Sequence, residues 1–540
     1  MKKQVWKNGV AILLAGSFAV IAASCGKPAQ NNASTPVGDF KFGEDELSFT
    51  WHDNSDTAAA TIWADTSIPE KWIKENKKVN IKYTDPGGAA AEKLATMIVS
   101  DSFPDVITML RGQDTAKLIS SGKIVPINDF MEKYTVMKND LMDSGVFKMF
   151  AQPDGKIYEI PNWANAAGKP NGNNGWVVNT KFYNELGRPE IKTLDDFYNY
   201  LKAVKEKYPD VIPYETTDVF QGERYVLAAM AENMPPDMLN YFAYTDNDSM
   251  KSIFKHPAYR ETMLFLNKLF REKLMTQDAF SQTADQVKEK FANCKVALTT
   301  SAIGACENTR EDLKKLGADW ETITPPMKQG LDRSKTYSQG YDRMGWTEIL
   351  ITKDAKNPEG IYAYLDWLYS PEGQRLFSYG PQGMYYDEVT PEGYPVLKEN
   401  YFEAPNPGKE LTGNGSGAGL GNTSYVDGAG IFVNEQAPEN KKSWGKKQQL
   451  TNIWPYAKDI SEFSGIIPDQ STDEGIIYQT VTDLHKRARA KMLFAADEQE
   501  VNMLLDKLIE DTDKAGMDKL LASEEKTWKE NRNKLGNNKK

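Results

Sequence analysis

The amino-terminal part of the chain alternates short strand-like runs with helical segments. Residues 47–52, 79–83 and 106–110 are rich in β-branched and aromatic side chains, which favour strands. Residues 89–100 and 114–121 carry apolar side chains at helical spacing instead. This βαβαβ order predicts an α/β fold with a parallel sheet and helices on both faces. Ligands of such sheets bind beyond the carboxyl ends of the strands.

Two of the predicted strand ends carry side chains that suit ligand binding. Trp51, Asp53 and Asn54 lie at the end of the first strand, and Arg111 follows the third. An aromatic ring can stack on the apolar face of a sugar, while carboxylate, amide and guanidinium groups can bind its hydroxyls. We therefore expect these four residues to contact a ligand.

Further candidates lie at the ends of later strand-like segments. Trp163, Trp176 and Trp346 are such aromatic residues, and Asn162 and Arg343 lie beside them in the sequence. We expect these five residues to complete the ligand site. For each tryptophan, packing in a hydrophobic core is the competing interpretation.

Strand-like and helical segments continue to the carboxyl terminus. Thr193 and Asp196 form a capping box that opens a helix, and Asn357 and Ser370 precede Pro-Glu pairs that open two more. Residues 498–535 are helical, with charged faces. A chain of 540 residues predicts more than one domain. The further predicted strands are 176–179, 295–300 and 346–352.

Composition and missing motifs exclude several classes of function. The chain has 65 Lys plus Arg and 76 Asp plus Glu, a net charge of −11, which argues against a nucleic-acid partner. There are three His and three Cys, and no HExxH, Walker A, GxSxG or CxxC motif. We therefore predict no catalytic centre, no metal site and no cofactor.

The first 44 residues combine an export signal with a tether. Lys2, Lys3 and Lys7 precede a short apolar run that ends in Ala-Ala-Ser-Cys25, which resembles the lipobox of bacterial lipoproteins. The resemblance implies a signal peptide over residues 1–24 and a lipid anchor on Cys25, which would hold the protein at the outer face of the cell membrane. An ordinary secretory signal is the alternative. Residues 25–44, rich in small and polar side chains, predict a flexible tether.

Two cysteines remain, Cys294 and Cys306. In an extracellular protein they could form a disulfide that closes a short loop. Cys294 starts an apolar run, so two buried free thiols fit the sequence equally well. The spacing leaves both interpretations open.

Several blocks of sequence follow the lipobox in a fixed order. They are residues 47–52, 94–100, 104–107, 122–127, 155–161, 176–182, the capping box at Thr193, 357–359, 370–374, 379–380 and 488–535. Taken in this order, they resemble the bacterial extracellular solute-binding proteins of family 1, long subgroup, the lipoproteins that supply sugars to ABC importers. The resemblance implies a two-lobe periplasmic-binding-protein-like (type II) fold with discontinuous lobes, hinge crossings and extra carboxyl-terminal helices.

Mapped onto this chain, the resemblance divides it into two lobes. Lobe one takes residues 45–162 plus 340–395, and lobe two takes 175–335 plus 398–540. The crossings between them are expected at 162–175, 332–343 and 387–398, which are rich in Gly, Asn and Pro. A ligand between the lobes would stabilise the closed state by its higher affinity for that state.

The implied function is capture of an oligosaccharide and its delivery to the permease subunits of an ABC transporter, by a monomer. Some long relatives that bind acidic oligosaccharides carry a calcium loop after the helix that matches residues 195–207. Here residues 208–213 (YPDVIP) offer too few oxygen ligands, which leaves open whether the ligand is neutral or acidic. The alternatives are a secreted, lipid-anchored glycan-cleaving enzyme and a binder of another solute, such as a peptide.

Overall fold

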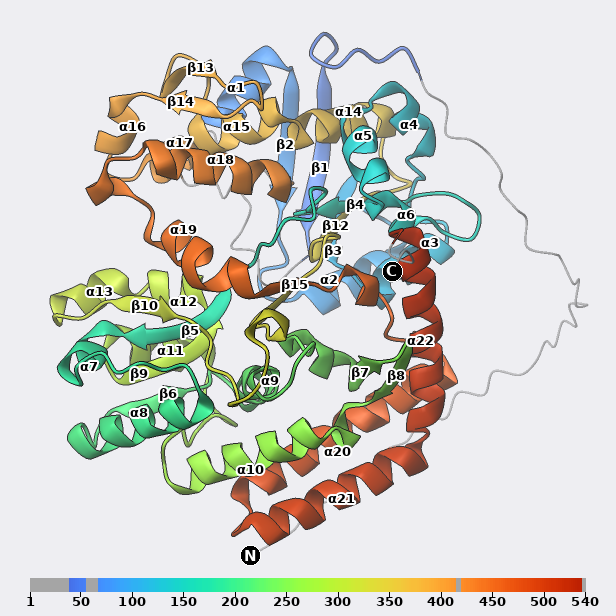
Figure 1. Ribbon diagram of the computed structural model, residues 1–540. Coiled ribbons are helices and arrows are strands. Elements are labelled where there is room, and N and C mark those ends of the chain that lie inside the picture. Colours follow the sequence, from blue (N-terminus) through green and yellow to red (C-terminus); the bar gives the residue numbers. More distant parts are fainter. Residues whose placement is uncertain (1–37, 55–66, 414–418, 537–540) are drawn as a thin grey trace, which may run out of the picture. The chain divides into compact units, whose positions relative to one another are not determined.

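Two separate β-sheets, each with its own helices, organise the chain (Figure 1). The computed structural model describes residues 38–54, 67–413 and 419–536, and the signal peptide, Cys25 and most of the predicted tether lie outside them. No helix in these ranges is long and apolar enough to cross a membrane.

The first sheet and its helices form lobe one. The strand order is β2 (Val79–Thr84), β1 (Leu47–Asp53), β3 (Val106–Leu110), β12 (Thr347–Ile351), β4 (Glu159–Asn162). β1 runs parallel to β2 and β3, as predicted. β12 is antiparallel to β3 and β4, which differs from the expected parallel sheet, because this strand returns from the other lobe. The helices are α1 (Ile68–Asn76), α2 (Ala90–Ser100), α3 (Gln113–Ser120), α4 (Asn128–Lys133), α5 (Val136–Asp143), α6 (Val146–Phe150), α14 (Pro358–Tyr369) and α15 (Pro371–Tyr379).

The second sheet belongs to lobe two. The strand order is β10 (Trp320–Ile323), β5 (Asn174–Asn179), β9 (Val296–Ala302), β6 (Ile212–Glu215). β5 is antiparallel to both neighbours, and β9 is parallel to β6. A hairpin, β7 (Ala243–Asp246) and β8 (Ser249–Ser252), lies outside this sheet. The helices are α7 (Thr180–Glu185), α8 (Leu194–Lys207), α9 (Val219–Met230), α10 (Pro257–Arg271), α11 (Ala284–Ala292), α12 (Ile303–Glu307) and α13 (Arg310–Lys315).

The predicted helix starts are confirmed by their hydrogen bonds. Thr193 Oγ1 accepts from Asp196 N at 3.1 Å, while Thr193 N donates to Asp196 Oδ2 at 2.9 Å, so both donors of the capping box are satisfied. Asn357 Oδ1 accepts from Gly360 N at 2.8 Å at the start of α14. Ser370 Oγ accepts from Gly373 N at 3.3 Å at the start of α15.

Two lobe boundaries expected from the sequence are wrong. Tyr425, on α18 (Thr423–Gln436), lies in one hydrophobic cluster with Tyr379 of α15, so this part of the predicted lobe two packs on lobe one. Phe42 belongs to the predicted tether, yet its ring centroid lies 5.7 Å from that of Trp367 on α14, so this residue packs on lobe one. The start of lobe one and the assignment of α18 were both misplaced, because an apolar pattern shows that a segment packs but not what it packs against. The small elements of this region are β13 (Tyr386–Val389), β14 (Pro395–Leu397), α16 (Glu399–Glu403) and α17 (Pro407–Thr412).

The chain passes between the two sheets at three places. One runs from β4 to β5, and the second, from β10 to β12, contains β11 (Gln339–Tyr341). The predicted third crossing is a hairpin of β13 and β14 within lobe one. The chain crosses instead between α18 and α19 (Trp444–Gln448), where Trp444 Nε1 donates to the Trp320 carbonyl at 2.9 Å. β15 (Ala457–Asp459) then pairs in parallel with β11.

The last three helices pack mainly on lobe two, as Figure 1 shows for α20 and α21 beside α10. They are α20 (Asp473–Phe494), α21 (Glu498–Ala515) and α22 (Met517–Lys534). Glu223 of α9 is fully buried and accepts hydrogen bonds from Tyr259 Oη at 2.6 Å and, from α20, Arg489 Nη1 at 3.1 Å. Its other α20 partner is His485 Nε2, at 2.7 Å. This network connects α20 to the core of lobe two.

The two remaining cysteines are free thiols. Cys306 is buried, and that burial raises the pKa of its thiol to about 12. Cys294 is partly buried, and Asn179 Nδ2 lies 3.4 Å from its sulfur. The sequence left open whether these cysteines form a disulfide, and in the structure they do not.

Candidate functional site

A cavity of about 590 Å³ lies between lobe one, the first two crossings, α18 and the segment after α19. This volume is within the range of small-molecule sites, ~300–1,000 Å³. We call it the tryptophan cavity, because two exposed tryptophans form part of its wall. Its lining residues are Trp163, Asn171, Gly172, Asn173, Gln339, Gly340, Tyr341, Asp342, Gly345, Trp346, Thr423, Val426, Asp427 and Gln449.

Trp163 and Trp346 come together because their strands are neighbours. Asn162 of β4 pairs with Thr347 of β12 in an antiparallel register, so the residues just beyond this pair are Trp163 and Trp346. Trp163 is 41% exposed and Trp346 is 50% exposed, unusually high for large aromatic side chains. Both were predicted from the sequence as ligand-binding residues, and both line the cavity.

The turn before Trp346 depends on a glycine. Gly345 has a φ of +68°, and a Cβ atom there would lie 1.9 Å from the Asn162 carbonyl oxygen. A side chain would therefore separate β12 from β4 and move Trp346 away from Trp163.

Trp163 rests on a loop that comes from far along the chain. Trp163 N donates to the Gly421 carbonyl at 2.9 Å, and a Cβ at Gly421 would lie 2.3 Å from the indole ring. Asn162 holds the same loop, since its Oδ1 accepts from Gly421 N at 2.7 Å and its Nδ2 donates to the Gly419 carbonyl at 3.1 Å. Asn162 is only 6% exposed, so it supports Trp163 rather than lining the cavity.

Trp51 and Trp176 are core residues, in contrast to the expectation that they contact a ligand. Trp51 is fully buried, stacks on Tyr83 at 5.0 Å and donates from Nε1 to Thr108 Oγ1 at 2.8 Å. Trp176 is 1% exposed and packs edge-on against Phe197 at 5.2 Å. Alternate strand residues face opposite sides of a sheet, and each indole points into a hydrophobic cluster beneath helices: Trp51 lies with Phe49 and Tyr364, and Trp176 lies with Phe197 and Tyr214.

Asp53 and Asn54 lie at the carboxyl end of β1, as predicted, but not among the described residues that line the tryptophan cavity. Asn54 is buried, and its Oδ1 lies 3.2 Å from His52 Nε2. Its backbone N–H donates to the Thr108 carbonyl at 2.7 Å, which extends the pairing of β1 with β3.

Arg111, a predicted ligand contact, instead connects lobe one to the second crossing. Its guanidinium donates to the carbonyls of Met344 and Gly345 and lies 3.4 Å from Asp342 Oδ2. It also donates to Ser464 Oγ at 3.0 Å, beyond β15. The side chain also lines a separate cavity of about 650 Å³, together with Glu159 and Ser464, and not the tryptophan cavity.

Arg343 is likewise used within the protein. Its Nε and Nη2 both lie 2.7 Å from Asp459 Oδ2, which fastens β15 beside the second crossing. The side chain lines a separate, charged cavity of about 770 Å³ that also contains Lys458 and Arg532. It is therefore placed away from the two tryptophans.

The residues that the sequence analysis missed supply most of the polar wall. Asn173 and Gln339 come from the crossings, Asp427 comes from α18, and Gln449 comes from the segment after α19. Amide side chains of this kind can donate to and accept from sugar hydroxyls at once. Only the Gly- and Asn-rich composition of residues 162–175 pointed to any of them; Asp427 and Gln449 reach the site through packing that no local pattern indicates.

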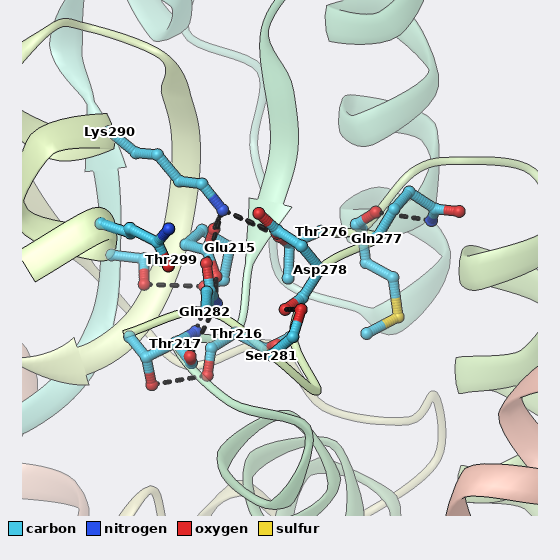
Figure 2. Close-up of polar contacts among 12 residues, drawn as sticks. Glu215, Thr216, Thr217, Thr276, Gln277, Asp278, Ser281, Gln282, Lys290 and Thr299 are labelled. Atoms are coloured by element: carbon cyan, nitrogen blue, oxygen red, sulfur yellow. Dashed lines mark hydrogen bonds and ion pairs between the residues drawn. The ribbon is translucent and has the colours of Figure 1, made fainter. Parts of the chain in front are cut away.

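Polar side chains also gather at the carboxyl end of β6, where several of them bind one another (Figure 2). Lys290 Nζ lies 2.7 Å from Asp278 Oδ1 and 3.3 Å from Oε2 of the buried Glu215. Gln282 Nε2 donates to Glu215 Oε1 at 2.8 Å. The Lys290 ammonium thus lies between the Asp278 and Glu215 carboxylates, where a bound cation would otherwise lie. Among the described residues, no group of three or more His, Cys, Asp or Glu side chains could hold a metal ion.

Comparison with solved structures agrees with the two-lobe architecture. The alginate-binding protein AlgQ2, solved without calcium ion, is 18% identical, with a TM-score of 0.65 over 90% of this chain and 98% of that one. FusA, an ABC-transporter substrate-binding protein of S. pneumoniae solved with kestose, is 18% identical, with a TM-score of 0.65 over 89% and 99% of the two chains. Identities this low show the fold alone.

Comparison of sequences shows the family. The polygalacturonan/rhamnogalacturonan-binding protein YtcQ of Bacillus subtilis (strain 168) is 21% identical over 396 residues, which is 70% of this chain and 73% of YtcQ. Residues 59–375 match the family described as bacterial extracellular solute-binding protein. This match covers more than half of the chain, which therefore belongs to the bacterial extracellular solute-binding proteins.

Proposed function

We propose that this protein captures an oligosaccharide between its two lobes and delivers it to the permease subunits of an ABC transporter. The observation that carries the proposal is the pair of exposed indoles, Trp163 and Trp346, in one cavity with amide and carboxylate side chains. Sugar rings offer apolar C–H faces and a rim of hydroxyls, so they are bound by aromatic surfaces together with a few polar groups.

The position of the cavity supports capture by closure of the lobes. Its wall includes Gln339, Tyr341 and Asp342 of the second crossing, so a bound solute would contact the segment about which the lobes move. A solute that touches both lobes stabilises the closed state in proportion to its extra affinity for that state.

The test is a thermal-shift and calorimetric screen of the whole mature protein against plant, bacterial and storage oligosaccharides. A true ligand present at 100 times its Kd should raise the free energy of unfolding by about 2.7 kcal/mol. Reducing-end assays on every bound sugar should show no product above the background, since we propose a binding protein and not a glycan-cleaving enzyme. Binding of peptides but of no sugar would contradict the proposal.

We also propose that the mature chain begins at a lipid-modified Cys25. Residues 1–24 have the basic start and apolar run of an export signal, and small residues precede the cysteine. In a bacterial host, Cys25→Ser is expected to release the protein from the membrane fraction into the soluble extracytoplasmic fraction, because stable anchoring needs the acyl chains. Cys294→Ser, which affects a partly buried thiol in lobe two, is the matched control and should stay membrane-bound. Membrane retention of the Cys25 variant would contradict the anchor.

A further inference from the structure

The described wall of the tryptophan cavity carries negative charge and no positive charge. Asp342 and Asp427 line it, and no lysine, arginine or histidine does so among the residues that the structure describes. The two internal segments outside that description, 55–66 and 414–418, also contain no lysine, arginine or histidine in their sequence. A site for a carboxylated sugar normally offers a guanidinium or an ammonium to each carboxylate.

Asp427 lines the cavity, whereas the cation that pairs with it does not. Lys446 Nζ is 3.1 Å from Asp427 Oδ1, and the Lys446 side chain is only 14% exposed. The ammonium is held 4.7 Å above the ring of Trp454 and is absent from the cavity lining. Burial raises the pKa of Asp427, against the opposing effect of Lys446.

Asp342 has the same arrangement on the crossing side. Its cation, Arg111, lies 3.4 Å from Asp342 Oδ2 and donates from Nη1 to Ser464 and from Nη2 to the Met344 and Gly345 carbonyls, while its Nε lies 3.7 Å from Glu348 Oε2. Arg111 is not among the cavity-lining residues. Lys446 and Arg111 therefore pair with groups of the protein outside the cavity lining, whereas Asp427 and Asp342 line the cavity.

These charges favour an uncharged ligand. A sugar hydroxyl can donate a charge-assisted hydrogen bond to either aspartate while the sugar faces stack on the indoles. A sugar carboxylate would lose its water next to a carboxylate of the same sign, with no cation to replace that water.

We propose that the cavity selects an uncharged oligosaccharide and that Asp427 is the residue that discriminates against a uronic-acid chain. This inference rests on the proposed function and narrows it to one class of sugar. Asp427 acts by repelling the carboxylates of an acidic chain. Its contribution is therefore measured as the ratio of the affinities for a neutral and an acidic chain, and not as the affinity for one ligand.

The test compares neutral and acidic chains of equal length. The probes are gluco-, galacto-, manno-, xylo- and fructo-oligosaccharides of three to five sugars, together with oligogalacturonates and oligomannuronates of the same lengths. We expect a neutral chain to bind about 100-fold more tightly than any uronate. Preferred binding of a uronate would overturn this inference and leave the proposed function intact. Binding of no sugar at all would instead overturn the proposed function.

Asp427→Asn tests the role of the residue itself. With the wall carboxylate neutralised and Lys446 retained, uronate affinity should rise by about tenfold relative to the affinity for the best neutral chain. Asp312→Asn is the matched control, since Asp312 pairs with Lys315 at 2.7 Å on the exposed helix α13. It should leave the ratio unchanged. An unchanged ratio in the Asp427 variant would overturn its proposed role.

Ionic strength gives a measurement that needs no variant. The affinity of the wild-type protein for its best neutral chain should change by less than about twofold between about 50 and 500 mM NaCl. An uncharged sugar makes no ion pair with the protein that salt could screen. A steep fall in affinity with salt would show that attraction between charges holds the ligand, and would overturn the inference even if the Asp427 variant failed to fold.

Discussion

Replacing Trp346 by Ala is expected to weaken oligosaccharide binding by about 2–3 kcal/mol, or roughly 30- to 150-fold, and to leave the free energy of unfolding almost unchanged. Half of this side chain is exposed in the tryptophan cavity, so its removal deletes a stacking surface and not core packing. Trp163→Ala should weaken binding similarly, because the hydrogen bonds that hold Gly421 come from the Trp163 backbone and from Asn162 and do not need the indole. Calorimetry with the best oligosaccharide measures the affinity, and urea unfolding measures the stability.

The matched controls are the two tryptophans buried in the cores. Trp51→Ala and Trp176→Ala should each cost about 3–5 kcal/mol of unfolding free energy, as large-to-small changes in cores do. Affinity of the fraction that remains folded should change much less. If Trp346→Ala instead lowered the stability and left affinity intact, the tryptophan cavity would not be the binding site.

Glu223→Gln is expected to lower the free energy of unfolding at neutral pH by about 3 kcal/mol. Although burial alone would raise it, the pKa of Glu223 is lowered to about 2 by His485, Arg489 and the Tyr259 hydroxyl. The amide leaves the partly buried Arg489 guanidinium without its counter-charge, and α20 loses part of its attachment to α9. Chemical denaturation of the two proteins at pH 7 measures the difference.

The pH dependence follows from the direction of that shift. A carboxylate with a lowered pKa in the folded state contributes its stability above the unfolded value, about 4.3, and loses it as the pH falls toward 2. The difference between the wild-type protein and Glu223→Gln should therefore be complete above about pH 5 and shrink steadily below about pH 4. Glu311→Gln, which affects an exposed glutamate paired with Lys314, should show at most a small dependence, because solvent screens an exposed pair. A difference independent of pH would assign the effect to packing alone.

Local patterns in the sequence were sufficient where local physics decides the outcome. The period of apolar residues and the cap chemistry predicted β1, β3 and α8, including both hydrogen bonds of the Thr193 box. The order of motifs predicted the family to which the chain belongs. Trp163 and Trp346 could be named because each stands next to a strand end, where ligands of α/β folds bind.

The tertiary structure decided which face each candidate takes and which distant segments meet. Trp51 and Trp163 both stand near strand ends, yet one is fully buried and the other is 41% exposed, since a step of one residue along a strand reverses the side. Asp427 lies on a helix that the sequence assigned to the other lobe, and its packing partner is set by contacts far along the chain. The sequence by itself therefore determined the fold class and two of the cavity tryptophans. Long-range packing determined the rest of the cavity wall and the sign of its charge, because the side-chain environment depends on contacts that no local spacing encodes.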